Sequence, residues 1–206
     1  MNAKPVIVVG AGVEAKIVAD VLAQCNVLVY GFLLPDARKA ESEWNDVPVL
    51  GTLDDKQYHS TLKNEKTDFV IASEAPELRR ALLKKLFEMT GRFPQTVVAP
   101  SAVVSPHAKV EPGNVVYALA TLGPNVELGP LNIVGAGALL EPEVRIAGFA
   151  NVGWGVKIGR GVVVDEGAYI GAGAVIFPHV RIGKNAVVKP GVVVADDLEA
   201  GAKAEP

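Results

Sequence analysis

Aliphatic residues recur at every sixth position over most of the second half of the chain. The series begins at Val104, ends at Val194 without interruption, and contains only Val, Leu and Ile. An Ala, Asn or Val stands two positions before each member. A fixed short period is the signature of a solenoid, in which each repeat stacks on its neighbours. The pattern predicts a β-solenoid from Pro100 to about Asp196, with the aliphatic side chains pointing inward.

Glycine and proline occupy the steps that follow each aliphatic residue. Glycine often comes directly after it, as at Gly123, proline one step later, as at Pro124, and a second glycine one step beyond, as at Gly137. Proline fixes φ for a turn, and glycine adopts the left-handed conformations that other residues resist. Each six therefore predicts a short strand closed by a turn, and three sixes predict one triangular coil of 18 residues.

The first 98 residues show a different pattern, in which apolar runs alternate with helix-spaced segments. Strands are predicted at 6–9, 27–34 and 68–72, with a short strand or turn at 47–51. Helices are predicted at 14–22 and at 77–90, the second one ended by Gly91. Strands that alternate with helices indicate an α/β fold with a doubly wound parallel sheet.

The turn Gly10-Ala-Gly12 follows the first of these strands and precedes a helix. Backbone N–H groups at a helix N-terminus suit a phosphate, so Gly10 and Gly12 are candidate nucleotide-binding residues. The glycine pattern is incomplete, because Ile17 and Val18 stand where a third glycine is expected. A tight turn without a ligand explains the two glycines equally well. Asp36, after the second strand, is either a ribose-binding carboxylate or a solvated turn residue.

Composition narrows the class of protein. Half of the 206 residues are hydrophobic and the net charge is −3, which favours neither a nucleic-acid nor a membrane partner. The sequence has no apolar run of membrane-spanning length and no signal-peptide pattern, so we expect a cytoplasmic protein without membrane insertion. Cys25 is the single cysteine, which excludes an intrachain disulfide and a cysteine metal cluster.

The chain as a whole resembles the sugar acyltransferases related to sialic acid O-acetyltransferase, including the bacterial N-acetyltransferases of UDP-linked amino sugars. The resemblance is carried by 6–12, 30–33, 47–51, 78–82, 100–102 and 171–176. It implies a Rossmann-like domain for a nucleotide or nucleotide-sugar at 1–98, a left-handed parallel β-helix of hexapeptide repeats at 99–196, and a tail at 197–206. It also implies a homotrimer that holds acetyl-CoA, the co-substrate, between neighbouring β-helices.

The resemblance assigns candidate residues near acyl-CoA late in the β-helix. These residues are Asn151, Gly153, Trp154, Gly171, Gly173, Lys184 and Lys189. Trp154 stands at a turn step that small residues usually fill. It either contacts or blocks the ligand groove, or packs against the neighbouring subunit or the N-terminal domain. Lys184 and Lys189 either meet the CoA phosphates or are solvated turn residues.

The histidines of the family are missing from this chain. Relatives carry a histidine in a turn after Gly-Ala-x-[Val/Leu], as the general base, and a second histidine about nine residues later. Here Pro142 and Asn151 stand at these positions. Glu143 is the candidate replacement base, and Glu141 is the neighbour that would increase its proton affinity. Two solvated turn carboxylates are the simpler interpretation.

The remaining histidines do not suggest another site. His107 and His179 fall in the column of Glu143, each two coils away, or about 10 Å, too far for proton transfer. They are about 19 Å from one another, so no zinc site of the carbonic-anhydrase kind is expected.

Two functions remain open from the sequence. The first is an acyl-CoA-dependent acetyltransferase for a nucleotide-linked or polysaccharide sugar. The second is a trimeric non-catalytic relative that binds or scaffolds after losing its general base. In either case we expect a homotrimer, because outward apolar residues such as Leu119, Leu131, Leu139, Val163 and Val175 need cover.

Overall fold

The computed structural model describes residues 4–36, 43–44 and 46–205. They form two compact units, Met1–Val97 and Val98–Pro206. The boundary lies within one residue of the expected one.

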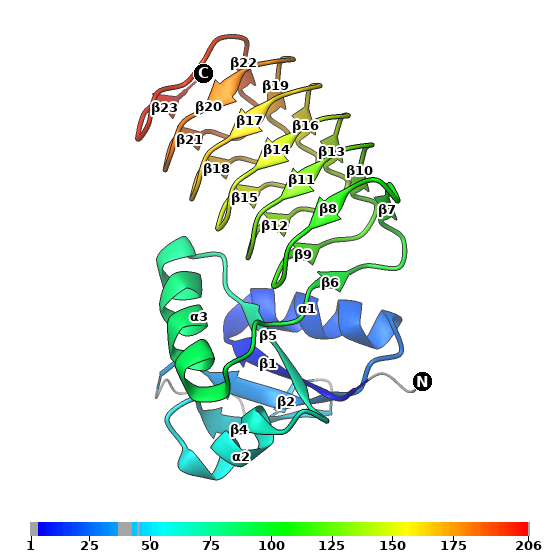
Figure 1. Cartoon of the computed structure of the whole chain (residues 1–206), viewed down its shortest axis with the longest axis vertical. Coiled ribbons are helices and arrows are strands. Elements are labelled where there is room, and N and C mark those ends of the chain that lie inside the picture. Colours follow the sequence, from blue (N-terminus) through cyan, green and yellow to red (C-terminus); the bar gives the residue numbers. More distant parts are fainter. Residues whose placement is uncertain (1–3, 37–42, 45, 206) are drawn as a thin grey trace. The chain divides into compact units, whose positions relative to one another are not determined.

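The first unit is a mostly parallel sheet with helices along it (Figure 1). Its elements are β1 (Val6–Gly10), α1 (Gly12–Gln24), β2 (Val29–Leu34), β3 (Glu43–Trp44), β4 (Val47–Thr52), the 3-10 turn η1 (Lys56–Tyr58), α2 (His59–Lys63), β5 (Asp68–Ala72) and α3 (Pro76–Thr90). Among the described residues the strand order is β3-β4-β2-β1-β5, and β3 runs antiparallel to β4. The doubly wound α/β expectation is confirmed, whereas β3, η1 and α2 were not predicted.

Strand β1 is the core of this sheet. Val6 to Val9 are fully buried, because strands lie on both sides of β1 and helices cover the sheet. The chain leaves β1 toward β2 on one side and reaches β5 on the other. Strand order therefore reverses at β1, and ligands of such sheets bind outside the carboxyl ends of the strands at this point.

The second unit is a left-handed parallel β-helix of two-residue strands on three faces (Figure 1). The first face holds β7 (Val103–Val104), β10 (Thr121–Leu122), β13 (Leu139–Leu140), β16 (Lys157–Ile158), β19 (Val175–Ile176) and β22 (Val193–Val194). The second holds β8 (Lys109–Val110), β11 (Glu127–Leu128), β14 (Arg145–Ile146), β17 (Val163–Val164) and β20 (Arg181–Ile182). The third holds β6 (Val97–Val98), β9 (Val115–Val116), β12 (Ile133–Val134), β15 (Asn151–Val152), β18 (Tyr169–Ile170), β21 (Val187–Val188) and β23 (Lys203–Ala204).

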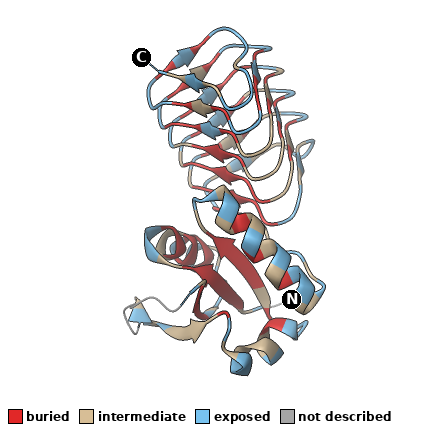
Figure 2. Ribbon diagram, turned by 90° about the vertical axis from the view of Figure 1, so that its left-hand side faces the viewer, coloured by how far each residue is buried: buried red, intermediate tan, exposed pale blue. Residues whose placement is uncertain are grey.

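The register confirms the predicted coil of 18 residues. Leu122 pairs with Leu140, and Leu140 pairs with Ile158, so each inward residue stacks on its equivalent in the next coil. These side chains and the small residues two positions before them form the buried interior, which Figure 2 shows as a continuous buried column. Burial of a Val, Leu or Ile side chain contributes about 1.5–3 kcal/mol, so the repeat is also the main source of stability.

Each face ends in a turn, and we name the turns after the face that they follow. The first corner comprises 105–107, 123–125, 141–143, 159–161 and 177–179, and the third corner comprises 117–119, 135–137, 153–155, 171–173 and 189–191. The last residue of most turns has a positive φ, between 55° and 66° even at Leu119, Leu131, Glu143, Phe149 and His179. A left-handed conformation costs a non-glycine residue about 1–2 kcal/mol.

Two of the apolar residues expected to face outward do not lie on strands. Leu119 and Leu131 are the last residues of turns; Leu119 is exposed as expected, whereas Leu131 is fully buried, so the expectation was wrong for Leu131. Leu139 does lie on a strand with an exposed side chain, as do Val103 and Val193 on the same face.

The chain continues the β-helix beyond the expected end at Asp196. Ile182 forms a bridge with Leu198, and β23 pairs with β21 through Val187 and Lys203. These partners are 16 residues apart instead of 18, so the last coil is shorter than the others. The stretch interpreted as a tail is therefore largely a final, tightened coil.

Candidate functional site

The turn Glu141-Pro142-Glu143 lies on the first corner, between β13 and β14. Glu141 Oε2 accepts a hydrogen bond of 2.8 Å from the backbone N–H of Arg160 in the next coil. Glu141 thus links two coils and is committed to that contact. Pro142 and Glu143 are exposed, and no described residue forms an ion pair or hydrogen bond with the Glu143 carboxylate. The Glu143 carboxylate is therefore available to contact a ligand.

A groove of about 420 Å³ runs along this corner and the second face. Its lining is Asn125, Glu127, Glu143, Arg145, Gly161, Val163 and His179. Glu127 lies 3.0 Å from Lys109 and 3.7 Å from Arg145, measured between charged atoms. The hydrogen bond and charge of Lys109, and then the charge of Arg145, lower the pKa of the Glu127 carboxyl. The groove therefore combines charges of both signs and includes the imidazole of His179.

The side chain of His179 leans toward the coil that separates it from Glu143. Gly161 occupies the coil between them, and a Cβ atom built on Gly161 would meet His179 Nδ1 at 2.7 Å. The imidazole thus fills the space left by the missing side chain of Gly161. The expected separation of about 10 Å between His179 and Glu143 assumed a side chain at the level of its own coil, whereas the imidazole leans toward Gly161 in the next coil.

The residues assigned to acyl-CoA are divided between strands and corners. Gly153, Trp154, Gly171, Gly173 and Lys189 lie on the third corner. Lys184 lies on the second corner, where its Nζ is 3.5 Å from Glu166 Oε2, while Lys189 Nζ is 3.8 Å from Glu205 Oε1. Asn151 begins β15 on the third face and is 8% exposed. The two lysines therefore do not share one site.

The glycines of the third corner have two different roles. A Cβ on Gly153 would meet the Ala172 nitrogen at 2.6 Å, and one on Gly171 would meet the Pro190 nitrogen at 2.5 Å. These two glycines are needed because adjacent coils approach closely. Gly173, with φ +69°, has nothing within 4 Å of such a Cβ and lies on the open surface.

Trp154 packs on its own β-helix. Its ring centroid is 6.4 Å from that of Tyr117, at 46°, across the coil that contains Ala136. Slightly more than half of the side chain, 54%, stays exposed. The contact with Tyr117 was not among the expected ones, and the exposed face of the ring is available to a ligand or another chain.

In the first unit the candidate residues follow or end two neighbouring strands, β1 and β2, at their carboxyl ends. A Cβ on Gly10 would meet the Ala72 carbonyl oxygen at 2.1 Å, so Gly10 is required by the close approach of the two strands. Gly12 opens α1 with φ +76° and nothing within 4 Å of a Cβ, which leaves the helix N-terminus accessible. Asp36 lies exposed after β2. Gly12 and Asp36 thus remain candidates, whereas Gly10 has a sufficient structural role.

Arg79 of α3 lies at the same edge of the sheet and was missed. It is 1% exposed, and its Nη1 donates hydrogen bonds to the carbonyl oxygens of Ser73 and Glu74, at 2.8 and 2.9 Å. Burial lowers the pKa of its guanidinium to about 10, and the charge of buried Glu14 opposes this shift. Arg79 stays charged at neutral pH and holds the loop after β5. The sequence feature that could have revealed Arg79 is its position on the buried face of α3, which it shares with Leu82 and Leu86.

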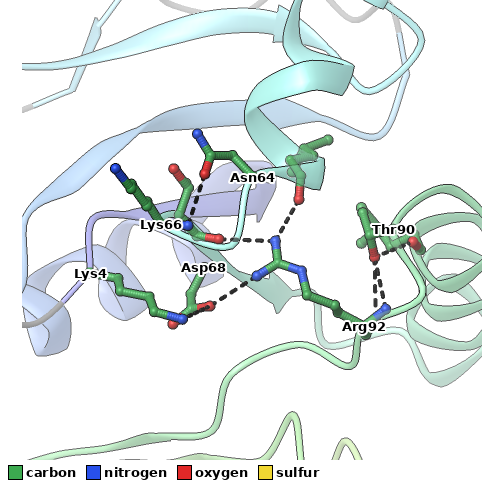
Figure 3. A network of polar contacts seen from close by, with 9 residues as sticks. Lys4, Asn64, Lys66, Asp68, Thr90 and Arg92 are labelled. Carbon is green, nitrogen blue, oxygen red and sulfur yellow. Dashed lines mark hydrogen bonds and ion pairs between the residues drawn. The ribbon is translucent and has the colours of Figure 1, made fainter.

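A second arginine network lies at the opposite, amino end of β5 and has a structural role (Figure 3). Arg92 contacts Asp68 Oδ1 at 3.2 Å and donates to the carbonyl oxygens of Leu62 and Thr67. Lys4 approaches Asp68 at 3.8 Å. These contacts connect the segments on both sides of β5 and lie away from the carboxyl ends of the strands, where Gly12 and Asp36 are found.

Within residues 4–36, 43–44 and 46–205, no three His, Cys, Asp or Glu side chains are arranged to hold a metal ion. No described helix has both the length and the apolar character needed to cross a bilayer.

Comparison with known proteins found matches to both units of the chain. Residues 5–86 match the PglD N-terminal domain. A histidine-to-asparagine variant of perosamine N-acetyltransferase from Caulobacter crescentus, solved with CoA and GDP-perosamine, is 29% identical with a TM-score of 0.88. The match covers 97% of this chain and 92% of that one. No curated protein sequence matches significantly.

Two further structures share the fold. The acetyltransferase domain of PglB from Neisseria gonorrhoeae, solved with acetyl coenzyme A, is 24% identical with a TM-score of 0.88 and matches over 98% of this chain and 95% of that one. WeeI from Acinetobacter baumannii is 23% identical with a TM-score of 0.61 and matches over 97% and 95%. The resemblance seen in the sequence is confirmed: residues 5–86 match the PglD N-terminal domain, and the chain has the fold of the hexapeptide-repeat sugar acetyltransferases.

Proposed function

We propose that the chain is an acetyl-CoA-dependent N-acetyltransferase that acts on a nucleotide-linked amino sugar. The observation that carries this proposal is the near-full-length similarity to an enzyme solved with CoA and GDP-perosamine. The sugar amine would attack the thioester carbonyl, forming a C–N bond and releasing the CoA thiolate, while a base accepts the proton of the amine. The positions of Gly12 and Asp36 support nucleotide binding, because they lie at the carboxyl ends of the strands, where sheets of this kind bind nucleotides.

The active form is proposed to be a homotrimer. Glu143 and the first-corner groove lie at one edge of the first face, while Trp154 and Gly173 lie at its other edge. Within one chain the candidate acceptor and CoA residues are therefore separated. When two chains pack side by side, the first corner of one meets the third corner of its neighbour and completes the site. Exposed apolar residues on the first face, Val103, Leu139 and Val193, favour such packing.

A second candidate function is a non-catalytic, trimeric relative that binds the same ligands. It is favoured by Pro142 and Asn151, which replace the histidines that the family carries. Proline has no side-chain group that accepts a proton. This candidate keeps the fold and the ligand sites and lacks turnover.

The test incubates the purified chain with acetyl-CoA and a GDP- or UDP-linked amino sugar, and measures free CoA thiol and the mass of the sugar. The same nucleotide sugar with a hydroxyl in place of the amine is the matched control. We expect CoA release and an added acetyl group with the amine only. Tight acetyl-CoA binding by calorimetry without release would instead support the second function. If the chain neither binds acetyl-CoA nor releases CoA, both proposed functions are contradicted.

A further inference from the structure

The groove on the first corner holds an imidazole and a carboxylate that no resemblance assigns together. His179 and Glu143 are both last residues of first-corner turns, with φ of 65° and 66°, and both are exposed. Both line the same groove of about 420 Å³. No described residue forms an ion pair or hydrogen bond with either side chain, so both are available to a bound molecule.

Gly161 is the feature that lets the two side chains approach. Coils of parallel strands are about 4.8 Å apart, so Cα atoms two coils apart are separated by about 10 Å. The imidazole of His179 leans over Gly161, with Nδ1 2.7 Å from the position of a Cβ there. It therefore lies about one coil from the backbone of Glu143, within reach of an extended carboxylate side chain. The ring edge nearest Gly161 carries Nδ1, which leaves Nε2 on the other edge of the ring.

We infer that His179 is the general base of this chain, with Glu143 as the residue that positions it. The inference rests on the proposed acetyltransferase function. Neutral His179 accepts the proton of the attacking amine at Nε2 while the C–N bond forms and the C–S bond breaks. The imidazolium then returns the proton to the departing CoA thiolate, which balances the reaction. The two side chains form no hydrogen bond with each other in the structure; when the substrates are bound, Glu143 accepts one from Nδ1–H, which fixes the tautomer and stabilises the imidazolium, as a carboxylate does in other histidine-based sites.

Several charged residues lie around the His179 imidazole. Arg145 lines the groove with Glu143. The backbone carbonyl oxygen of Arg160 accepts a hydrogen bond from the backbone N–H of His179, at 2.9 Å. Arg181, in the coil of His179, is paired with Asp165, and its backbone N–H donates to Asp197. The Glu143 carboxylate can stabilise the imidazolium that forms during proton transfer.

The test compares kcat/KM of the full-length wild type with that of His179→Gln, using acetyl-CoA and the amino sugar accepted above. His107→Gln is the matched control, because His107 has the same turn step on the same corner and lies outside the groove. General-base catalysis contributes about 10²–10⁴-fold, so His179→Gln should lose at least a hundredfold in kcat with little change in KM for acetyl-CoA. His107→Gln should keep wild-type turnover.

The pH profile distinguishes catalysis from a structural role. The wild type should lose activity as the pH falls, because a protonated imidazole cannot accept the proton of the amine. His179→Gln should lack this limb. Glu143→Gln should shift the limb to lower pH, because the imidazolium loses its carboxylate partner.

A glycine pair tests the position of the ring. Gly161→Ala inserts a Cβ at 2.7 Å from Nδ1 and should displace the imidazole and reduce turnover at least tenfold. Gly201→Ala carries the same conformational penalty, since φ is +71° there, without a neighbour within 4 Å. If the wild type turns over and His179→Gln keeps the same kcat, the inference about His179 is overturned while the proposed function stands. Equal losses of turnover in Gly161→Ala and Gly201→Ala would have the same consequence. A wild type that never releases CoA would overturn the proposed function as well.

Discussion

At the residue scale, the most informative side chains are those that interrupt the repeat. Pro142 restores the common turn residue where the family carries a histidine, and the sequence alone reveals this loss. The position of the His179 imidazole over Gly161 was not predictable from the sequence. Spacing gives the coil to which each residue belongs, but the direction of the imidazole depends on whether the neighbouring coil leaves space for it. The sequence therefore assigns each candidate residue to a corner of the β-helix but does not give the direction of its side chain.

Asn132 is a residue whose role is also set by stacking. Its Oδ1 accepts the Ala150 N–H at 2.7 Å, and its Nδ2 donates to the Gly129 carbonyl at 2.8 Å, in a fully buried position. Asn132→Ala would remove the hydrogen bond to the Ala150 N–H, while the Gly129 carbonyl oxygen keeps the one from Asn114 Nδ2, at 2.9 Å. Loss of a buried hydrogen-bond partner costs about 1–3 kcal/mol, so we expect the free energy of unfolding in urea to fall by about that amount.

Thr121→Ala is the control for this change, since Thr121 lies on a strand with a half-buried side chain. It should change the stability by less than about 0.5 kcal/mol. Equal effects of the two substitutions would contradict a specific role for the Asn132 hydrogen bonds.

At the scale of elements, the period of six predicted the strands, the turns and the coil length, because each of them follows from local backbone preferences. Short elements of the first unit, β3 and α2, were missed since tertiary pairing and not local pattern defines them. The left-handed leucines were missed for a related reason. Their conformation is imposed by hydrogen bonds between coils, such as that from the Leu131 N–H to the Pro112 carbonyl at 3.2 Å.

Two leucines with the same backbone conformation should respond in opposite directions to glycine. Leu119 has φ 61° and is 69% exposed, whereas Leu131 has φ 55° and is fully buried. Leu119→Gly relieves left-handed strain of about 1–2 kcal/mol and should leave stability unchanged or raise it slightly, after the entropic cost of glycine. Leu131→Gly removes a core side chain and should cost about 2–5 kcal/mol.

Chemical denaturation of both leucine variants checks the pair. Destabilisation by Leu119→Gly of the same size as that by Leu131→Gly would contradict the strain argument. It would indicate that Leu119 is covered by another chain.

At the scale of the whole molecule, the separation of candidate residues between two corners predicts that assembly and activity fail together. Leu139 lies on the first face, which joins these corners, and is 37% exposed. Leu139→Glu should reduce the mass measured by light scattering from three chains to one and abolish turnover, because a charge replaces an apolar contact.

Lys157→Glu, at the neighbouring position of the same face, is the matched control with the same introduced side chain. It should retain the trimer. A monomeric wild type, or a fully active monomer of Leu139→Glu, would contradict the proposed assembly.

The shortened last coil has a consequence for solubility. A stack of parallel coils ends in unpaired backbone N–H and C=O groups, which form a template for growth into fibres. Here the last coil is two residues shorter than the others, and Leu198 forms a β-bridge with Ile182. Asp197 Oδ1 accepts a hydrogen bond of 2.7 Å from the backbone N–H of Arg181. Asp196 and Glu199 add charge at this end. Removal of residues 197–206 should therefore yield a protein that forms elongated polymers with increasing concentration, visible by electron microscopy, whereas the full chain should stay dispersed.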